Sequence, residues 1–212
     1  MIIDKVMLGQ YESRYRALLI NSLAGVRQAI LIGTKSKDGC SNLAIFNSLI
    51  HIGASPPLWG FICRPEIVKR DTLNNILENN QYTINYVSAS DFEKAHQTSA
   101  KYEKVVSEFE ACGFTEYYHT NFEAPFIAEA PIKVAMKLEQ KIDIAINNTI
   151  LIIGSIRHIE IDEAFVSADG FVDLSQANTL ACVGLDAYYK TNLIERLNYA
   201  RPDQPTTKLL YR

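Results

Sequence analysis

Cysteine is scarce in this sequence, and its spacing argues against the two classes of protein that depend on it. The chain has four cysteines, and no two of them form a Cys-x-x-Cys pair. Metal-binding and disulfide-rich domains place their cysteines in close pairs or in a dense framework. We therefore expect a cytoplasmic protein with buried, apolar thiols in a reducing environment, at Cys40, Cys63, Cys112 and Cys182.

Long hydrophobic runs and strong charge are also missing. Apolar runs such as residues 150–153 are far shorter than the roughly 20 residues that a membrane helix needs. The first residues include an acid, Asp4, and no long apolar core, so we expect no signal peptide. The net charge is −3, whereas a nucleic-acid-binding face is concentrated and basic. We expect no membrane segment and no nucleic-acid partner.

Motifs of several common chemistries are absent. There is no Gly-x-Gly-x-x-Gly after a strand, no Gly-x-Ser-x-Gly and no His-Glu-x-x-His. This argues against a Rossmann cofactor domain, an α/β-hydrolase nucleophile and a zinc protease. No pair of histidines has metal-ligand spacing, so we expect no metal. Taken singly, His51 favours a core or interface position, His119 a surface position and His158 an exposed strand position.

The most informative segment of the sequence is residues 29–76, which combine strand signals with polar residues that are unusual in a strand. An apolar run at 29–32 is followed by Asp38-Gly39, a strong hairpin signal. The second run, 42–49, holds side chains that each cost about 1–3 kcal/mol if they are buried without a partner. These side chains are Asn42, Asn47 and Ser48. Something in the fold or a ligand must satisfy them.

A cationic loop and a helix start come next. A third strand is predicted at 58–62, and Asp71-Thr72 is typical of the N-cap of a helix over 72–79. The unpaired N–H groups and positive dipole of a helix start suit an anion such as a phosphate. The loop before this helix contains two arginines, Arg64 and Arg70. The spacing by itself favours the simpler alternative, an ordinary hairpin followed by an ordinary capped helix.

The rest of the chain predicts mainly strands with a few helices. Residues 1–12 suggest an irregular arm. Apolar alternation predicts further strands at 81–87, 132–138, 142–146 and 149–161. Apolar spacing and capping signals predict helices at 12–24, 90–96 with a capping box at Ser90, and 100–111 with Gly113 as its cap. Many short strands and turns such as Asn147-Asn148 favour a mainly β fold, a small antiparallel barrel with inserted helices.

The run 95–100, Ala-His-Gln-Thr-Ser-Ala, joins two of the predicted helices. Polar groups at such a junction can line a ligand cleft, which would give His96 a functional role. Thr98 and Ser99 can equally form a local capping cluster without a ligand. The residues alone leave both alternatives open.

Several of these segments form an ordered set of motifs between about residues 18 and 202. They are Thr34…Gly39-x-x-Asn42-x-Ala44…Ser48, Pro56-Pro57, Arg64…Arg70-Asp71-Thr72-Leu73…Ile76, Tyr82-Thr83-Ile84-Asn85, 95–100 and 184–188. This set resembles the flavin reductase-like family, whose members are FMN-binding split β-barrels. The family includes the reductase components of two-component monooxygenases.

The resemblance implies one split-barrel domain over 1–212, with a helical insertion near 88–113 and a C-terminal extension from about 184. It also implies FMN, or alternatively FAD, as cofactor and NAD(P)H as reductant, its nicotinamide stacked on the flavin in an open cleft. The flavin ring edge and ribityl chain would meet Asn42, Asn47 and Ser48. The implied cofactor-binding set is Asn42, Ala44, Phe46, Asn47, Ser48, Arg64, Arg70, Asp71, Thr72, Thr98, Ser99 and Ala100, with His96 as catalytic residue.

The function that we expect from this resemblance is NAD(P)H-dependent reduction of flavin, with the electrons passed to an unspecified acceptor. The resemblance also implies a homodimer with flavin near the subunit boundary, and an oxygenase as a partner. Aromatic residues of the kind enriched at interfaces, such as Trp59, Tyr188 and Tyr199, fit a dimer. Two alternatives remain, a flavin-binding carrier or sensor without efficient turnover and a barrel that serves only as an interaction module.

Overall fold

The computed structural model describes residues 1–65, 71–103 and 105–209. Its helices are α1 (Lys5–Gln10), α2 (Ser13–Leu23), α3 (Asp71–Asn79), α4 (Phe92–Gln97) and α5 (Glu108–Cys112), with 3-10 turns at Ala89–Asp91 and Glu163–Phe165. Its longer strands are β2 (Ile30–Lys35), β3 (Ser41–Phe46), β4 (Ile50–Ala54), β5 (Pro57–Cys63), β6 (Gln81–Tyr86), β9 (Ile132–Ile144) and β10 (Thr149–Ile161). The shorter strands are β1 (Arg27–Gln28), β7 (Glu116–Tyr117), β8 (Phe126–Ile127), β11 (Leu180–Val183) and β12 (Ala187–Lys190).

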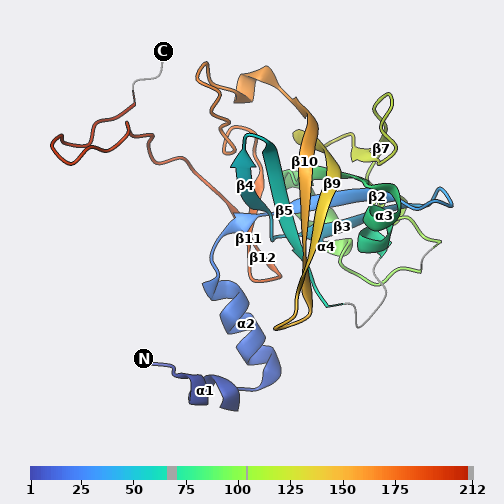
Figure 1. Cartoon of the computed structure of the whole chain (residues 1–212), viewed down its shortest axis with the longest axis horizontal. Helices are drawn as coiled ribbons and strands as arrows, with labels where there is room; N and C mark the ends of the chain where they lie inside the picture. Colours follow the sequence, from blue (N-terminus) through green and yellow to red (C-terminus); the bar gives the residue numbers. More distant parts are fainter. Residues whose placement is uncertain (66–70, 104, 210–212) are drawn as a thin grey trace.

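A seven-stranded antiparallel sheet, ordered β3-β2-β6-β9-β10-β5-β4, forms the body of the protein (Figure 1). Its two outermost strands, β3 and β4, are consecutive in the chain, so the sheet must curl to bring its edges together. Ser48, between them, joins the two sides: its Oγ donates to the Ile62 carbonyl and accepts from the Ile62 N–H at 3.2 and 3.0 Å. Phe46 packs edge-on against Phe61 across the same seam, at 5.1 Å. The chain is therefore mainly β, as its sequence predicts.

Local turn chemistry sets the register of the main hairpins. Gly39 lies at φ 89° in the β2–β3 turn, and Asn148 at φ 58° in the β9–β10 turn. Glycine and asparagine tolerate this left-handed region better than other residues. Both turns lie where the sequence predicts them.

Two hydrophobic clusters lie on the opposite faces of the sheet. The first fills the barrel interior and includes Phe61, Tyr82 and Met136. The second lies between β2–β3, the β1-β11-β12 sheet and the α4–α5 segment, and includes Leu31 and Phe109. This second layer holds α4 and β12 beside the main sheet.

Several sequence-based predictions are corrected. The predicted strand at 142–146 is the end of one long strand, β9, and β4 and α1 are unexpected elements. The helix predicted at 100–111 is wrong, because among the described residues of that range only those of α5 are helical, although Gly113 does cap α5 at φ 73°. Val105 is 79% exposed, so part of the apolar face that suggested this helix has nothing to pack against. The capping box at Ser90 is also wrong, since Ser88 caps the turn that precedes α4.

The cysteines divide between the core and a turn. Three of them are buried as predicted, namely Cys63, Cys112 and Cys182. Cys40 is exposed, because it lies beside the β2–β3 turn, outside both hydrophobic clusters.

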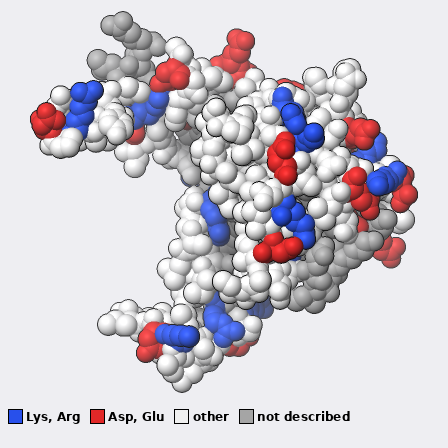
Figure 2. Space-filling model, viewed as in Figure 1, with Lys and Arg blue, Asp and Glu red and all other residues white. Residues whose placement is uncertain are grey.

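The two ends of the chain extend away from the barrel. The N-terminal helices α1 and α2 project from one side, and the segment after β12 projects from the same side further along (Figure 1). Figure 2 shows that the surface between these two projections is hollowed. No residue of α2 is buried, although Leu18, Ile20 and Leu23 are apolar and 42%, 50% and 72% exposed. Within the described residues, no helix combines the length and the hydropathy that crossing a membrane requires.

Candidate functional site

A buried polar cluster fixes the start of α3 against β2 and β3. The amide nitrogen of Asn42 donates to Thr34 Oγ1 at 3.2 Å and to Thr72 Oγ1 at 3.0 Å. Asn75, one turn along α3, donates to the same Thr34 oxygen at 3.1 Å. All four residues are buried, and Thr72 is 6% exposed. The amide that the sequence marks as unusual within a strand is therefore satisfied by neighbouring side chains.

This cluster places the first turn of α3 at a fixed position beside the start of β3 and the end of β2. The first N–H groups of a helix have no partner within the helix, and they lie at its positive end. Asp71 and Thr72 belong to this turn, with Asp71 partly exposed. Arg64, at the end of β5, is exposed, whereas the predicted site residue Arg70 lies outside the described residues.

The end of β3 carries the next group of predicted site residues. Ala44 pairs with Ile32 of β2 and is partly exposed, as is Phe46 two residues later. Asn47 donates from its amide to the carbonyl of Gly184, at 2.5 Å, in the β11–β12 turn. Asn47 and Ser48 thus bind backbone groups from distant parts of the chain, and both remain partly exposed.

The other side of the same β11–β12 hairpin contacts α4. His96 Nδ1 lies 2.9 Å from Tyr188 Oη, and the two rings meet edge to face at 5.8 Å. His96 is exposed, whereas burial raises the pKa of Tyr188 to about 12. Tyr188 therefore stays a neutral phenol that can donate to or accept from the imidazole.

The other predicted site residues of the 95–100 run are one structural position, Thr98, and two exposed positions, Ser99 and Ala100. Thr98 is buried, and its hydroxyl donates to the Ala95 carbonyl at 2.8 Å, which is the capping role weighed from the sequence. Ser99 and Ala100 are exposed beside His96. The exposed members of this run are the ones that a ligand could reach.

Comparison with known proteins identifies the family to which this chain belongs. The model of the family described as "Flavin reductase like domain" matches residues 25–174. The chain belongs to the flavin reductase-like family. It is also similar to a crystal structure from Shewanella frigidimarina NCIMB 400, described as a candidate flavin reductase with a split barrel domain. The identity is 46% over 94% of this chain and 100% of that one, with a TM-score of 0.91.

Two further relatives are more distant. Nitrilotriacetate monooxygenase component B from Bacillus cereus has the same fold, with a TM-score of 0.81 at 18% identity, over 91% of this chain and 96% of that one. An uncharacterized protein of Halalkalibacterium halodurans is 28% identical over 186 residues, which cover 84% of this chain and 87% of that protein. The resemblance seen in the sequence motifs is thus confirmed, and the fold is the split barrel of this flavin-binding family.

Within this flavin reductase-like chain, the sequence suggested only an interface position for Tyr188 and did not indicate its contact with His96. Tyr188 lies outside the matched segment, and it reaches α4 only because the Gly184 turn, at φ 64°, folds β12 back along β11. The motif 184–188 was the available signal, although nothing in it pointed to His96. His119 is on the surface as predicted. The core position predicted for His51 is wrong, because His51 is exposed, and its interface alternative stays a prediction. The prediction of an exposed His158 is also wrong, because its ring packs against Phe126 at 5.5 Å.

Proposed function

We propose that this protein is an FMN-binding oxidoreductase that uses NAD(P)H to reduce flavin and passes the electrons to a further acceptor. The observation that carries the proposal is the family match across the barrel, which spans both β3 and the anchored start of α3. A flavin supplies the hydride-accepting ring when it is bound, and the protein supplies position and electrostatics.

The residues at the start of α3 fit a flavin phosphate. The backbone N–H groups of the first turn of α3, at Asp71 and Thr72, and the guanidinium groups of Arg64 and Arg70 would hold it, because charge-assisted hydrogen bonds suit phosphate oxygens. Asn42 has both amide hydrogens occupied, so its contribution is to hold Thr72 in place, while its carbonyl oxygen would face the ligand. Ala44 lacks a large side chain, which would let a planar ring approach β3.

The exposed side of α4 would form the wall of the flavin cleft against which the nicotinamide binds. His96 would position that ring, held in one orientation by Tyr188 at 2.9 Å. Ser99 and Ala100 would line the same wall, and Asn47 and Ser48 would meet the flavin from the end of β3. In this proposal no residue of the chain transfers the hydride itself.

A flavin-binding carrier or sensor without efficient turnover is the alternative to an enzyme. The visible absorption spectrum of freshly purified protein tests flavin binding, and steady-state NADH and NADPH oxidation with added FMN tests turnover. Bound flavin with rapid oxidation of either nucleotide supports the reductase. Bound flavin without turnover supports the carrier, and a protein that takes up no flavin contradicts both. An oxygenase partner is part of the proposal, by analogy with the monooxygenase component of the same fold.

The proposal includes a homodimer in which a second copy covers α2 and the segment after β12. Short isolated helices are marginal in water, so an 11-residue helix with no buried residue needs a partner. Exposed Leu23 on α2, and Ile194 and Tyr199 at 98% and 93% exposure on the C-terminal segment, offer apolar area beside the hollow in Figure 2. We expect light scattering to give a dimer at micromolar concentration, and Leu23→Asp to weaken it. A stable wild-type monomer that still binds flavin contradicts the dimer.

A further inference from the structure

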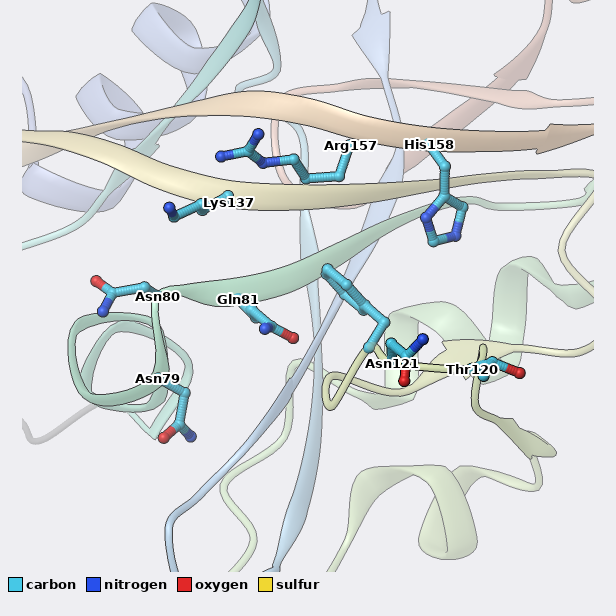
Figure 3. A pocket seen from close by; sticks show the side chains of 9 residues that line it. Asn79, Asn80, Gln81, Thr120, Asn121, Lys137, Arg157 and His158 are labelled. Atoms are coloured by element: carbon cyan, nitrogen blue, oxygen red, sulfur yellow. The ribbon is translucent and has the colours of Figure 1, made fainter.

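A polar pocket lies at the opposite end of α3 from the proposed phosphate site. It has a volume of about 490 Å³, which is in the range of small-molecule sites. The end of α3, the start of β6, the strands β9 and β10, and the loop 120–122 line it (Figure 3). None of its lining residues belongs to the residues proposed above to bind flavin.

Two cations line this pocket from neighbouring strands. Lys137 comes from β9 and Arg157 from β10, and Figure 3 shows both side chains extending in the same direction. Within the part of the chain that the structure describes, Lys137 has no ion-pair partner. Arg157 has one long contact, 3.4 Å to Glu139, at the exposed surface, which occupies only part of its five-donor guanidinium. The carboxylates that the structure places near this pair therefore do not neutralise both positive charges.

A β-bulge brings Arg157 into the pocket. On β10, Ile156 pairs with Met136 and His158 with Ala135, so Arg157 is an extra residue without a partner on β9. Consecutive side chains of a regular strand point to opposite faces. A bulge changes where its side chains point, and bulges are common next to binding sites. Here it allows two consecutive residues, Arg157 and His158, to line one pocket.

His158 brings an unsatisfied polar atom to the same pocket. Its Nε2 is buried and has no hydrogen-bond partner among the described residues. The ring is packed against His119 at 4.5 Å and Phe126 at 5.5 Å, and burial lowers the pKa of His158 below its ordinary value. Buried polar atoms in native proteins nearly always have a partner, and a missing one requires an explanation. The protein's own hydrogen bonding is therefore incomplete at the wall of this pocket.

We propose that this pocket binds a small aromatic anion. Lys137 and Arg157 hold its carboxylate or phosphate group, because charge-assisted hydrogen bonds favour such oxygens. Its ring packs against Phe122 and the imidazole of His158, which both line the pocket. The amide side chains of Asn80 and Asn121 line the remaining surface. The proposal does not depend on the flavin function, since the two sites share no residue.

The imidazole signals of the histidines give a local test. The chain has four histidines, so ¹H–¹³C NMR of the whole protein, assigned with single His→Gln variants, separates them. Benzoate and phenyl phosphate are the probes, and benzamide is the neutral control. We expect saturable shifts of His158 with benzoate, phenyl phosphate or both, and none with benzamide. The stronger probe identifies the anionic group as a carboxylate or a phosphate.

Charge variants complete the test. Arg157→Gln and Lys137→Gln should each weaken the binding of the stronger probe at least about tenfold, the loss of one charge-assisted contact. Lys37→Gln is the matched control, because it removes the same charge from the exposed β2–β3 turn. The proposal is overturned if neither probe shifts His158 at about 10 mM, a concentration that would nearly saturate a site with a dissociation constant of about 1 mM or lower. It is equally overturned if the probes shift only His96, or if Lys37→Gln weakens binding as much as the pocket variants.

Discussion

The hydrogen bond between Asn42 and Thr72 provides a sharp test of how the start of α3 is held. Thr72→Val removes the hydroxyl that accepts from Asn42 at 3.0 Å and leaves a similar shape. Thr34 Oγ1 cannot take over the freed N–H, because it already accepts from both Asn42 and Asn75. A buried donor left without a partner costs about 1–3 kcal/mol. We therefore expect Thr72→Val to lower the free energy of unfolding by about 2 kcal/mol.

Equilibrium unfolding in urea measures this loss, and Thr72→Ser is the matched control because it keeps the hydroxyl. The double variant Thr72→Val with Asn42→Ala should be more stable than the sum of the single losses predicts, by about 0.5–3 kcal/mol, since both changes break one contact. FMN affinity should fall with Thr72→Val, and riboflavin affinity should fall less. Additive losses, or a Thr72→Val protein as stable as Thr72→Ser, would refute this account of the cluster.

Three further predictions concern the flavin site and the barrel interior. Arg70→Ala should weaken FMN more than riboflavin in fluorescence titrations, because riboflavin lacks the phosphate, and equal losses would remove Arg70 from the phosphate site. His96→Ala should keep the stability within about 0.5 kcal/mol but change the rate of flavin reduction in stopped flow at saturating flavin; unchanged rate and affinity would make His96 structural. Gly154→Ala would place a Cβ 2.2 Å from Tyr82 Oη, so it should cost about 1–3 kcal/mol in urea unfolding. Tyr82→Phe should recover part of that loss, since this hydroxyl is buried without a partner among the described residues, and no recovery would show that other contacts dominate.

Features determined by a few neighbouring residues could be predicted from the sequence. The β2–β3 hairpin follows from Asp38-Gly39, and the helix predicted at 72–79 is confirmed as α3, although Asp71 lies in its first turn and is not its N-cap. The position of Asp71 and Thr72 at the start of that helix follows from the same local signal. These predictions succeed because the backbone conformation at each position depends on a residue type that tolerates it.

Contacts between distant segments could not be predicted in the same way. Asn47 meets Gly184, and His96 meets Tyr188, through pairings that depend on the fold of the β11–β12 hairpin. The wrong prediction for His158 has a local cause. The bulge at Arg157 shifts the alternation of inward and outward side chains from which the exposure of His158 was predicted. Alternation of apolar and polar residues predicts the face on which a side chain lies only while each residue of the strand pairs with one residue of its neighbour.

The β9–β10 hairpin also bears on the order in which the barrel assembles. Its two 13-residue strands meet through the short turn at Asn147-Asn148, so their pairing closes almost no loop. The strands on either side, β6 and β5, come from much earlier in the chain, and each must close a loop of many residues before it pairs. Local pairing is the faster event, so we expect this hairpin to form first and to serve as the template on which β6 and β5 dock. The seam at Ser48, which needs both ends of the sheet in place, would then close last.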